Sequence, residues 1–77
     1  MARIKDESAL AIQHGGKHYK GFAIQPIEYI YKNNIGYLEG NVIKYISRHN
    51  HKNGMEDLRK CNHYLEFIAE FVYGEKL

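Results

Sequence analysis

The 77-residue sequence has little of what very small domains use to reinforce their cores. Its one cysteine, Cys61, excludes an internal disulfide and favours a reducing, cytoplasmic compartment. No apolar run approaches the ~20 residues of a membrane span, and we expect neither a signal peptide nor a membrane partner. A chain this short buries only about 60% of its unfolded surface. We therefore expect self-association to supplement the core.

The sequence also has few of the patterns that mark common catalytic sites. It contains no GxxxxGK[ST] or GxGxxG phosphate loop, and no CxxC or HExxH metal pattern. Cys61 lies on an expected apolar stripe and Ser47 has no evident acid–base pair, so neither supports a covalent mechanism. The net charge of +2 is too small to indicate nucleic-acid binding by itself. What remains is a local concentration of basic side chains between residues 44 and 60.

The patterning predicts an all-α fold of about three helices, with an extended N-terminal segment. We expect residues 1–17 to form a flexible segment and residues 18–77 to form a single helical domain. Residues 18–25 have an extended pattern that Pro26 ends, because proline suits the first turn of a helix. The expected helices span residues 26–32, 37–49 and 55–73, and the last stops at Gly74.

Apolar periodicity divides the two longer helices into faces. The buried face predicted for the second helix comprises Leu38, Val42, Tyr45, Ile46 and His49. The third helix carries one stripe with Cys61 and a second, aromatic stripe of Tyr64, Phe67 and Phe71. Three short helices cannot easily cover so wide an apolar arc. We therefore expect a homo-oligomer that uses the aromatic side.

The second helix also carries a polar face that could bind a phosphate. Asn41, Lys44 and Arg48 lie at i, i+3 and i+7, and Lys52 follows in the next turn. Lysine supplies a point charge and arginine a planar fork, a combination that suits phosphate. Asp57 would then hold Lys44 or Arg48 in place, or bind a metal. The alternative is an ordinary solvated face with i, i+4 pairs, and periodicity alone does not separate the two.

Two further sets of residues could complete such a site. His18 and Tyr19 could stack on a base and read its edge, although Tyr19 could equally be a core residue. Glu39, Glu56 and Asp57 are candidates to hold Mg²⁺, which needs only one or two carboxylates when a phosphate accompanies it.

The residues resemble a known family over about positions 18–68. The sharpest pieces are His18-Tyr19, Pro26-Ile27-Glu28, Gly40-Asn41-Val42-Ile43-Lys44-Tyr45, Arg48, Lys52, Glu56-Asp57-Leu58, Lys60 and Tyr64. This order resembles the short phage proteins of the family that includes the phage deoxynucleoside monophosphate kinase. The resemblance implies a mostly helical, oligomeric protein in the cytoplasm of an infected cell, handling nucleotides without a P-loop.

The resemblance turns the polar face into specific expectations. A kinase would use ATP and Mg²⁺, with Lys44, Arg48 and Asp57 as catalytic residues and Asp57 and Glu56 as metal ligands. The nucleotide-binding residues would be His18, Tyr19, Asn41, Lys44, Tyr45, Arg48 and Lys52. Two alternatives stay open: a non-catalytic binder of nucleotides or cyclic nucleotide signals that acts against host defence, and an adaptor for a host protein. Nucleic acid is not an expected partner.

Overall fold

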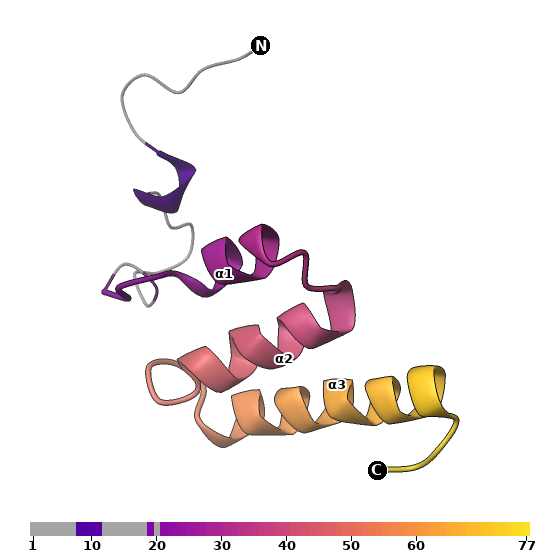
Figure 1. Ribbon diagram of the computed structural model, residues 1–77. Coiled ribbons are helices and arrows are strands. Elements are labelled where there is room, and N and C mark those ends of the chain that lie inside the picture. The colour runs from indigo at the N-terminus through magenta and orange to yellow at the C-terminus, as the bar shows by residue number, and fades with distance from the viewer. Residues whose placement is uncertain (1–7, 12–18, 20) are drawn as a thin grey trace.

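The computed structural model describes residues 8–11, 19 and 21–77. Most of the predicted flexible segment 1–17 lies outside the described residues, as does His18. The described chain forms a short 3₁₀ helix, η1 (Ala9–Ala11), and three α-helices, α1 (Pro26–Lys32), α2 (Tyr37–Arg48) and α3 (Met55–Tyr73) (Figure 1). The described residues contain no strand, which confirms the predicted all-α class.

Local sequence explains where the helices begin and end. Pro26 occupies the first turn of α1 behind an extended Gln25, as predicted. Gly74 ends α3 in the left-handed conformation, with its N–H bonded to the carbonyl of Glu70. The helix α2 ends at Arg48, one residue earlier than predicted. None of the helices in the described part of the chain has the length and apolar content to span a bilayer.

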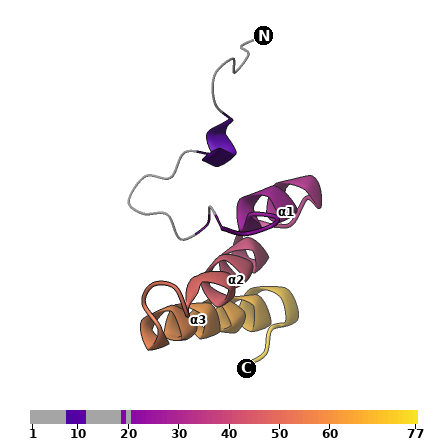
Figure 2. The same cartoon turned by 90° about the vertical axis from the view of Figure 1, so that its left-hand side faces the viewer.

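The helix α2 lies between α1 and α3, as two views at right angles agree (Figures 1 and 2). It packs against α3 along its length and against α1 at Gly40. Gly40 is buried, and a Cβ there would lie 3.3 Å from Cγ2 of Ile30. Glycine at this position therefore sets how closely α1 approaches α2.

The apolar core is very small. Among the described residues, the buried apolar side chains are Cys61, at 6% exposure, and Pro26. The predicted burial of Ile46 is wrong, because its side chain is 47% exposed. The side of α2 that meets α3 carries Tyr45 and Arg48, and Ile46 lies about 100° around the helix from Tyr45.

The connection between α2 and α3 depends on a glycine. Gly54 precedes α3 with φ 53° and ψ −122°, and its N–H bonds to the carbonyl of His49 at 2.8 Å. Side chains of L-residues rarely allow this backbone conformation. The turn therefore requires glycine at position 54.

Substitution of Gly54 should show this requirement directly. Gly54→Ala should lower the free energy of unfolding by about 1–3 kcal/mol, because the new Cβ strains the turn. Gly21→Ala is the matched control, since a Cβ at Gly21 would meet no atom within 4 Å. Urea unfolding followed by circular dichroism measures both, and equal midpoints for the two variants would contradict the assigned strain.

Candidate functional site

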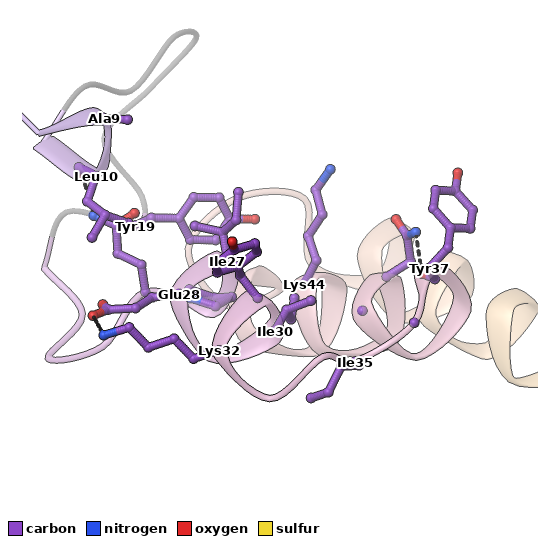
Figure 3. Close-up of a pocket in the computed structure, with 16 residues that line it drawn as sticks. Ala9, Leu10, Tyr19, Ile27, Glu28, Ile30, Lys32, Ile35, Tyr37 and Lys44 are labelled. Atoms are coloured by element: carbon purple, nitrogen blue, oxygen red, sulfur yellow. Dashed lines mark hydrogen bonds and ion pairs between the residues drawn. The ribbon is translucent and has the colours of Figure 1, made fainter. Parts of the chain in front are cut away.

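A groove of about 860 Å³ opens between η1, the residue-19 turn, α1 and α2 (Figure 3). This volume is within the usual range for small-molecule sites. Its walls are mainly apolar, and three tyrosines stand among them. The apolar and aromatic lining includes Leu10, Tyr19, Ile27, Ile30, Tyr31, Ile35 and Tyr37. The helix η1 forms one wall of the groove. The side-chain amide of Gln25 donates to the carbonyl of Leu10 at 2.5 Å and so links η1 to the start of α1.

Few charged groups line this groove. Glu28 and Lys32 form an ion pair at 3.2 Å, so their charges offset each other. Lys44 is different, because no carboxylate of the described residues lies within ion-pair distance of its ammonium group. Its Nζ lies 5.3 Å from the centre of the Tyr45 ring. In Figure 3 the Lys44 side chain projects from α2 on the same side as Tyr37. The groove thus combines an apolar and aromatic wall with a cation that has no counter-ion there.

Behind the groove, Arg48 and Asp57 form a buried ion pair between α2 and α3. The Arg48 Nε donates to Oδ2 of Asp57 at 3.1 Å, and Nη2 donates to Oδ1 at 3.0 Å. Asp57 is 0% exposed and Arg48 is 8% exposed. The Asn53 N–H also donates to Oδ2, at 3.2 Å. The pair therefore joins the end of α2, the turn and the start of α3.

The electrostatics follow from this geometry. The hydrogen bonds from Arg48 lower the pKa of Asp57, and burial opposes them. The same hydrogen bonds raise the pKa of Arg48. Two desolvated charges of this kind are stable only when each satisfies the other. The sequence allowed Asp57 either to hold a basic side chain or to bind a metal. In the structure Asp57 holds Arg48.

Neither of the carboxylates predicted as metal ligands, Asp57 and Glu56, lines the groove. Both oxygens of Asp57 already accept hydrogen bonds. Glu56 lies 3.8 Å from Lys60 and lines a separate shallow depression with Tyr64 and Phe67. Within the described ranges, no three His, Cys, Asp or Glu side chains are grouped to hold a metal.

The predicted nucleotide-binding residues divide into two groups. Tyr19, Asn41 and Lys44 line the groove. Tyr45 and Arg48 lie on the α3 side of α2, where the Arg48 guanidinium stacks 4.7 Å from the Tyr45 ring centre. Lys52 lies in the exposed turn before α3. His18 falls outside the described residues.

Sequence patterning missed the residues that give the groove its walls. The side chain of Ile27 is 64% exposed, and that of Tyr31 is 80% exposed. Tyr37, 76% exposed, was not singled out at all. The many apolar side chains of the seven-residue helix α1 are the signal that could have indicated Ile27 and Tyr31, whereas Tyr37 belongs to α2.

An aromatic row runs along α3 on the opposite side of α2. The ring of Tyr64 stacks against Tyr45 at 6.0 Å between centroids, and Tyr37 meets it edge-on at 6.2 Å. Phe67 lies 6.2 Å from Tyr64 and 5.4 Å from Phe71. Tyr64 and Phe67 are half-buried, whereas Phe71 is 65% exposed.

A family model described as "Protein of unknown function (DUF3310)" matches residues 13–66. The chain belongs to this family. The matched range includes α1, α2 and most of α3, and with them the groove lining from Tyr19 to Lys44 and the Arg48–Asp57 pair. No curated protein and no solved structure gives a significant match. The family description names no activity, so the kinase resemblance stays a prediction.

Proposed function

We propose that this protein binds a nucleotide in the groove between the N-terminal turns, α1 and α2, with Lys44 at the phosphate. The observation that carries the proposal is the Lys44 ammonium, which has no carboxylate partner in the described chain and stands at the edge of an apolar, tyrosine-containing groove. A nucleotide has the matching combination of a flat aromatic base and an anionic phosphate.

The groove offers a partner for each part of such a ligand. Ile27, Tyr31 and Tyr37 provide exposed apolar and aromatic surface against which a base can pack. The Asn41 amide nitrogen donates to the Tyr37 carbonyl at 2.8 Å, so the side-chain oxygen of Asn41 is left to accept from a sugar or base. Lys44 supplies a charge-assisted hydrogen bond to the phosphate.

Binding is proposed here as the core activity, and phosphoryl transfer as its extension. Transfer depends on positioning and on offsetting charge around the phosphate. Arg48 is already held by Asp57, and Glu56 lies outside the groove. Of the predicted catalytic residues, Lys44 is therefore the one available to a ligand in the groove.

A ligand screen by thermal shift tests the proposal. The four deoxynucleoside monophosphates, ATP, a cyclic dinucleotide and inorganic phosphate are each added to the purified protein. At least one nucleotide should raise the melting temperature, since binding to the folded state alone stabilises it by about 2.7 kcal/mol at a hundred times Kd. No shift with any nucleotide would refute the proposal. Incubation with ATP and Mg²⁺ then separates the kinase from the binder by the appearance of diphosphate.

We also propose that a second copy of the chain covers the exposed end of the aromatic row. The second half of α3 carries four large apolar side chains whose exposed fractions lie between 38% and 71%: Leu65, Phe71, Val72 and Tyr73. The described chain buries only two apolar side chains, Cys61 and Pro26, and a second copy would bury more apolar surface. Two α3 helices could pack symmetrically through Phe71 and the neighbouring Val72.

Native mass spectrometry tests this association. The wild type should give a multiple of the 9.0 kDa protomer mass. Phe71→Glu should weaken the association by about 10- to 100-fold, because it removes roughly 1.5–3 kcal/mol of apolar burial. Glu66→Gln, on the same helix, should leave the mass unchanged. A wild type that is monomeric at every concentration would contradict the proposal.

A further inference from the structure

Tyr19 lines the groove from a position outside the three α-helices. It lines the groove with Ile27 and Lys44, yet it belongs to the turn before α1. Its hydroxyl oxygen is buried. The position of this ring therefore depends on what packs behind it.

Two contacts hold Tyr19 from the α2–α3 end of the molecule. The first is with Arg48, whose guanidinium lies beside the Tyr19 hydroxyl and interacts with it electrostatically. The second is a chain of rings: Tyr19 meets Phe22 edge-on at 5.9 Å, and Phe22 meets His51 edge-on at 5.9 Å. Both contacts are with residues at the end of α2 and in the turn that follows it, Arg48 and His51. The Arg48–Asp57 pair joins this part of the chain to α3.

The pair holds that segment through the backbone as well. The His51 N–H donates to the carbonyl of Arg48 at 2.9 Å, and the Asn53 N–H donates to Asp57 at 3.2 Å. The turn that presents His51 to Phe22 is thus bonded to the backbone of Arg48 at one end and to the carboxylate of Asp57 at the other.

We propose that Arg48 and Asp57 are positioning residues for the groove: their ion pair fixes the Tyr19 wall and thereby sets ligand affinity without touching the ligand. Neither residue lines the groove. Because a wall fixed before binding does not have to be ordered by the ligand, the pair increases affinity through preorganisation. This inference rests on the proposed nucleotide site, and it assigns to Arg48 and Asp57 a role other than catalysis.

One consequence can be measured without any ligand. The chain has no tryptophan, so Phe22→Trp places a single fluorescent reporter against the Tyr19 ring and leaves the Tyr19 hydroxyl in place. In this background, Arg48→Lys should shift the tryptophan emission to longer wavelength and increase its quenching by acrylamide, while the helical circular dichroism is retained. Glu66→Gln, which breaks the exposed His63–Glu66 pair, is the control and should change neither signal. Unchanged emission in Arg48→Lys would overturn the inference.

A double-mutant cycle tests the effect on affinity. The probe is the deoxynucleoside monophosphate with the largest thermal shift, titrated against wild type, Arg48→Lys, Tyr19→Ala and the double variant. Arg48→Lys should weaken binding about tenfold when Tyr19 is present and cause almost no further loss when Tyr19 is alanine. Equal losses in both backgrounds would show direct contact between Arg48 and the phosphate, and would overturn the inference.

A milder variant keeps the test decisive if Arg48→Lys does not fold. Tyr19→Phe removes only the hydroxyl next to Arg48 and should weaken binding of the same probe several-fold; unchanged affinity would overturn the inference.

If the wild type binds no deoxynucleoside monophosphate, the proposed function fails. The emission of the Phe22→Trp reporter still decides whether the pair positions the wall, so the two failures are distinguishable.

Discussion

Asp57→Ala should unfold a large part of the protein population at room temperature. The substitution leaves the Arg48 guanidinium buried without its partner, and removing one member of a buried pair costs about 3–5 kcal/mol. A small domain has little more than this as its total stability. Circular dichroism during urea unfolding should therefore show a much lower midpoint, or no folded baseline.

The control for this loss is an exposed ion pair on the same helix. Glu66 lies 3.1 Å from His63, and both side chains are more than half exposed. Exposed pairs contribute little, so Glu66→Ala should unfold at nearly the wild-type urea concentration. Equal midpoints for Asp57→Ala and Glu66→Ala would mean that the buried pair does not hold the fold together.

Asp57 should also make the stability depend on pH. Its pKa is lower in the folded protein than in the unfolded chain, so its contribution is fully present above the unfolded value of about 4. That contribution is lost as the pH falls below 4 and through the folded pKa, because the unfolded chain binds the proton more readily. In Asp57→Asn this part of the acid dependence should disappear, as urea midpoints measured between about pH 5 and pH 2.5 would show. Parallel curves for the variant and the wild type would contradict the assignment.

Lys44→Ala should weaken nucleotide binding by about 10- to 100-fold. A hydrogen bond to a charged group contributes about 1.5–3 kcal/mol, and the described chain offers no second cation without a partner on this wall of the groove. The melting temperature without nucleotide should stay close to that of the wild type, because Lys44 forms no ion pair with the described residues. Isothermal titration with the best nucleotide of the thermal-shift screen measures the loss.

Lys60→Ala is a closely matched control. The ammonium groups of Lys44 and Lys60 lie 5.3 Å and 5.4 Å from the centre of the same Tyr45 ring. Only Lys44 lines the groove, whereas Lys60 lines the shallow depression on the α3 side. If both variants lost affinity equally, the basic surface around Tyr45 would be responsible, and the groove would not be the site.

The helices were predictable because their signals are local. Pro26 starts α1, Gly74 ends α3, and the apolar periodicity between them needs no knowledge of the tertiary structure. The burial of individual side chains was less predictable. Ile46 was expected to be buried and is exposed, whereas Arg48 was expected on the polar face and is buried. The reason is that Asp57, nine residues from Arg48, binds the guanidinium within the α2–α3 interface. A charge that is buried by a partner on another helix leaves no periodic signal.

The candidate site was predictable in its residue types and only partly in its position. Asn41 and Lys44 were found by their spacing on α2 and do line the groove. Arg48, found by the same spacing, faces α3. The opposite wall was missed because Ile27 lies on a helix too short for periodicity to assign a face, and Tyr37 lies at the very start of α2. The exposed fraction of the side chains on α1 depends on which other elements pack against that helix. This is a property of the whole fold, which local sequence does not reveal.

The most direct test of the nucleotide groove is chemical-shift mapping by NMR on ¹⁵N-labelled protein titrated with the best deoxynucleoside monophosphate. The proposal predicts the largest shifts at Ile27, Tyr37, Asn41 and Lys44, with smaller changes at Lys60 and Phe67. The largest shifts at Lys60, His63 and Phe67, or none anywhere at saturating nucleotide, would contradict it.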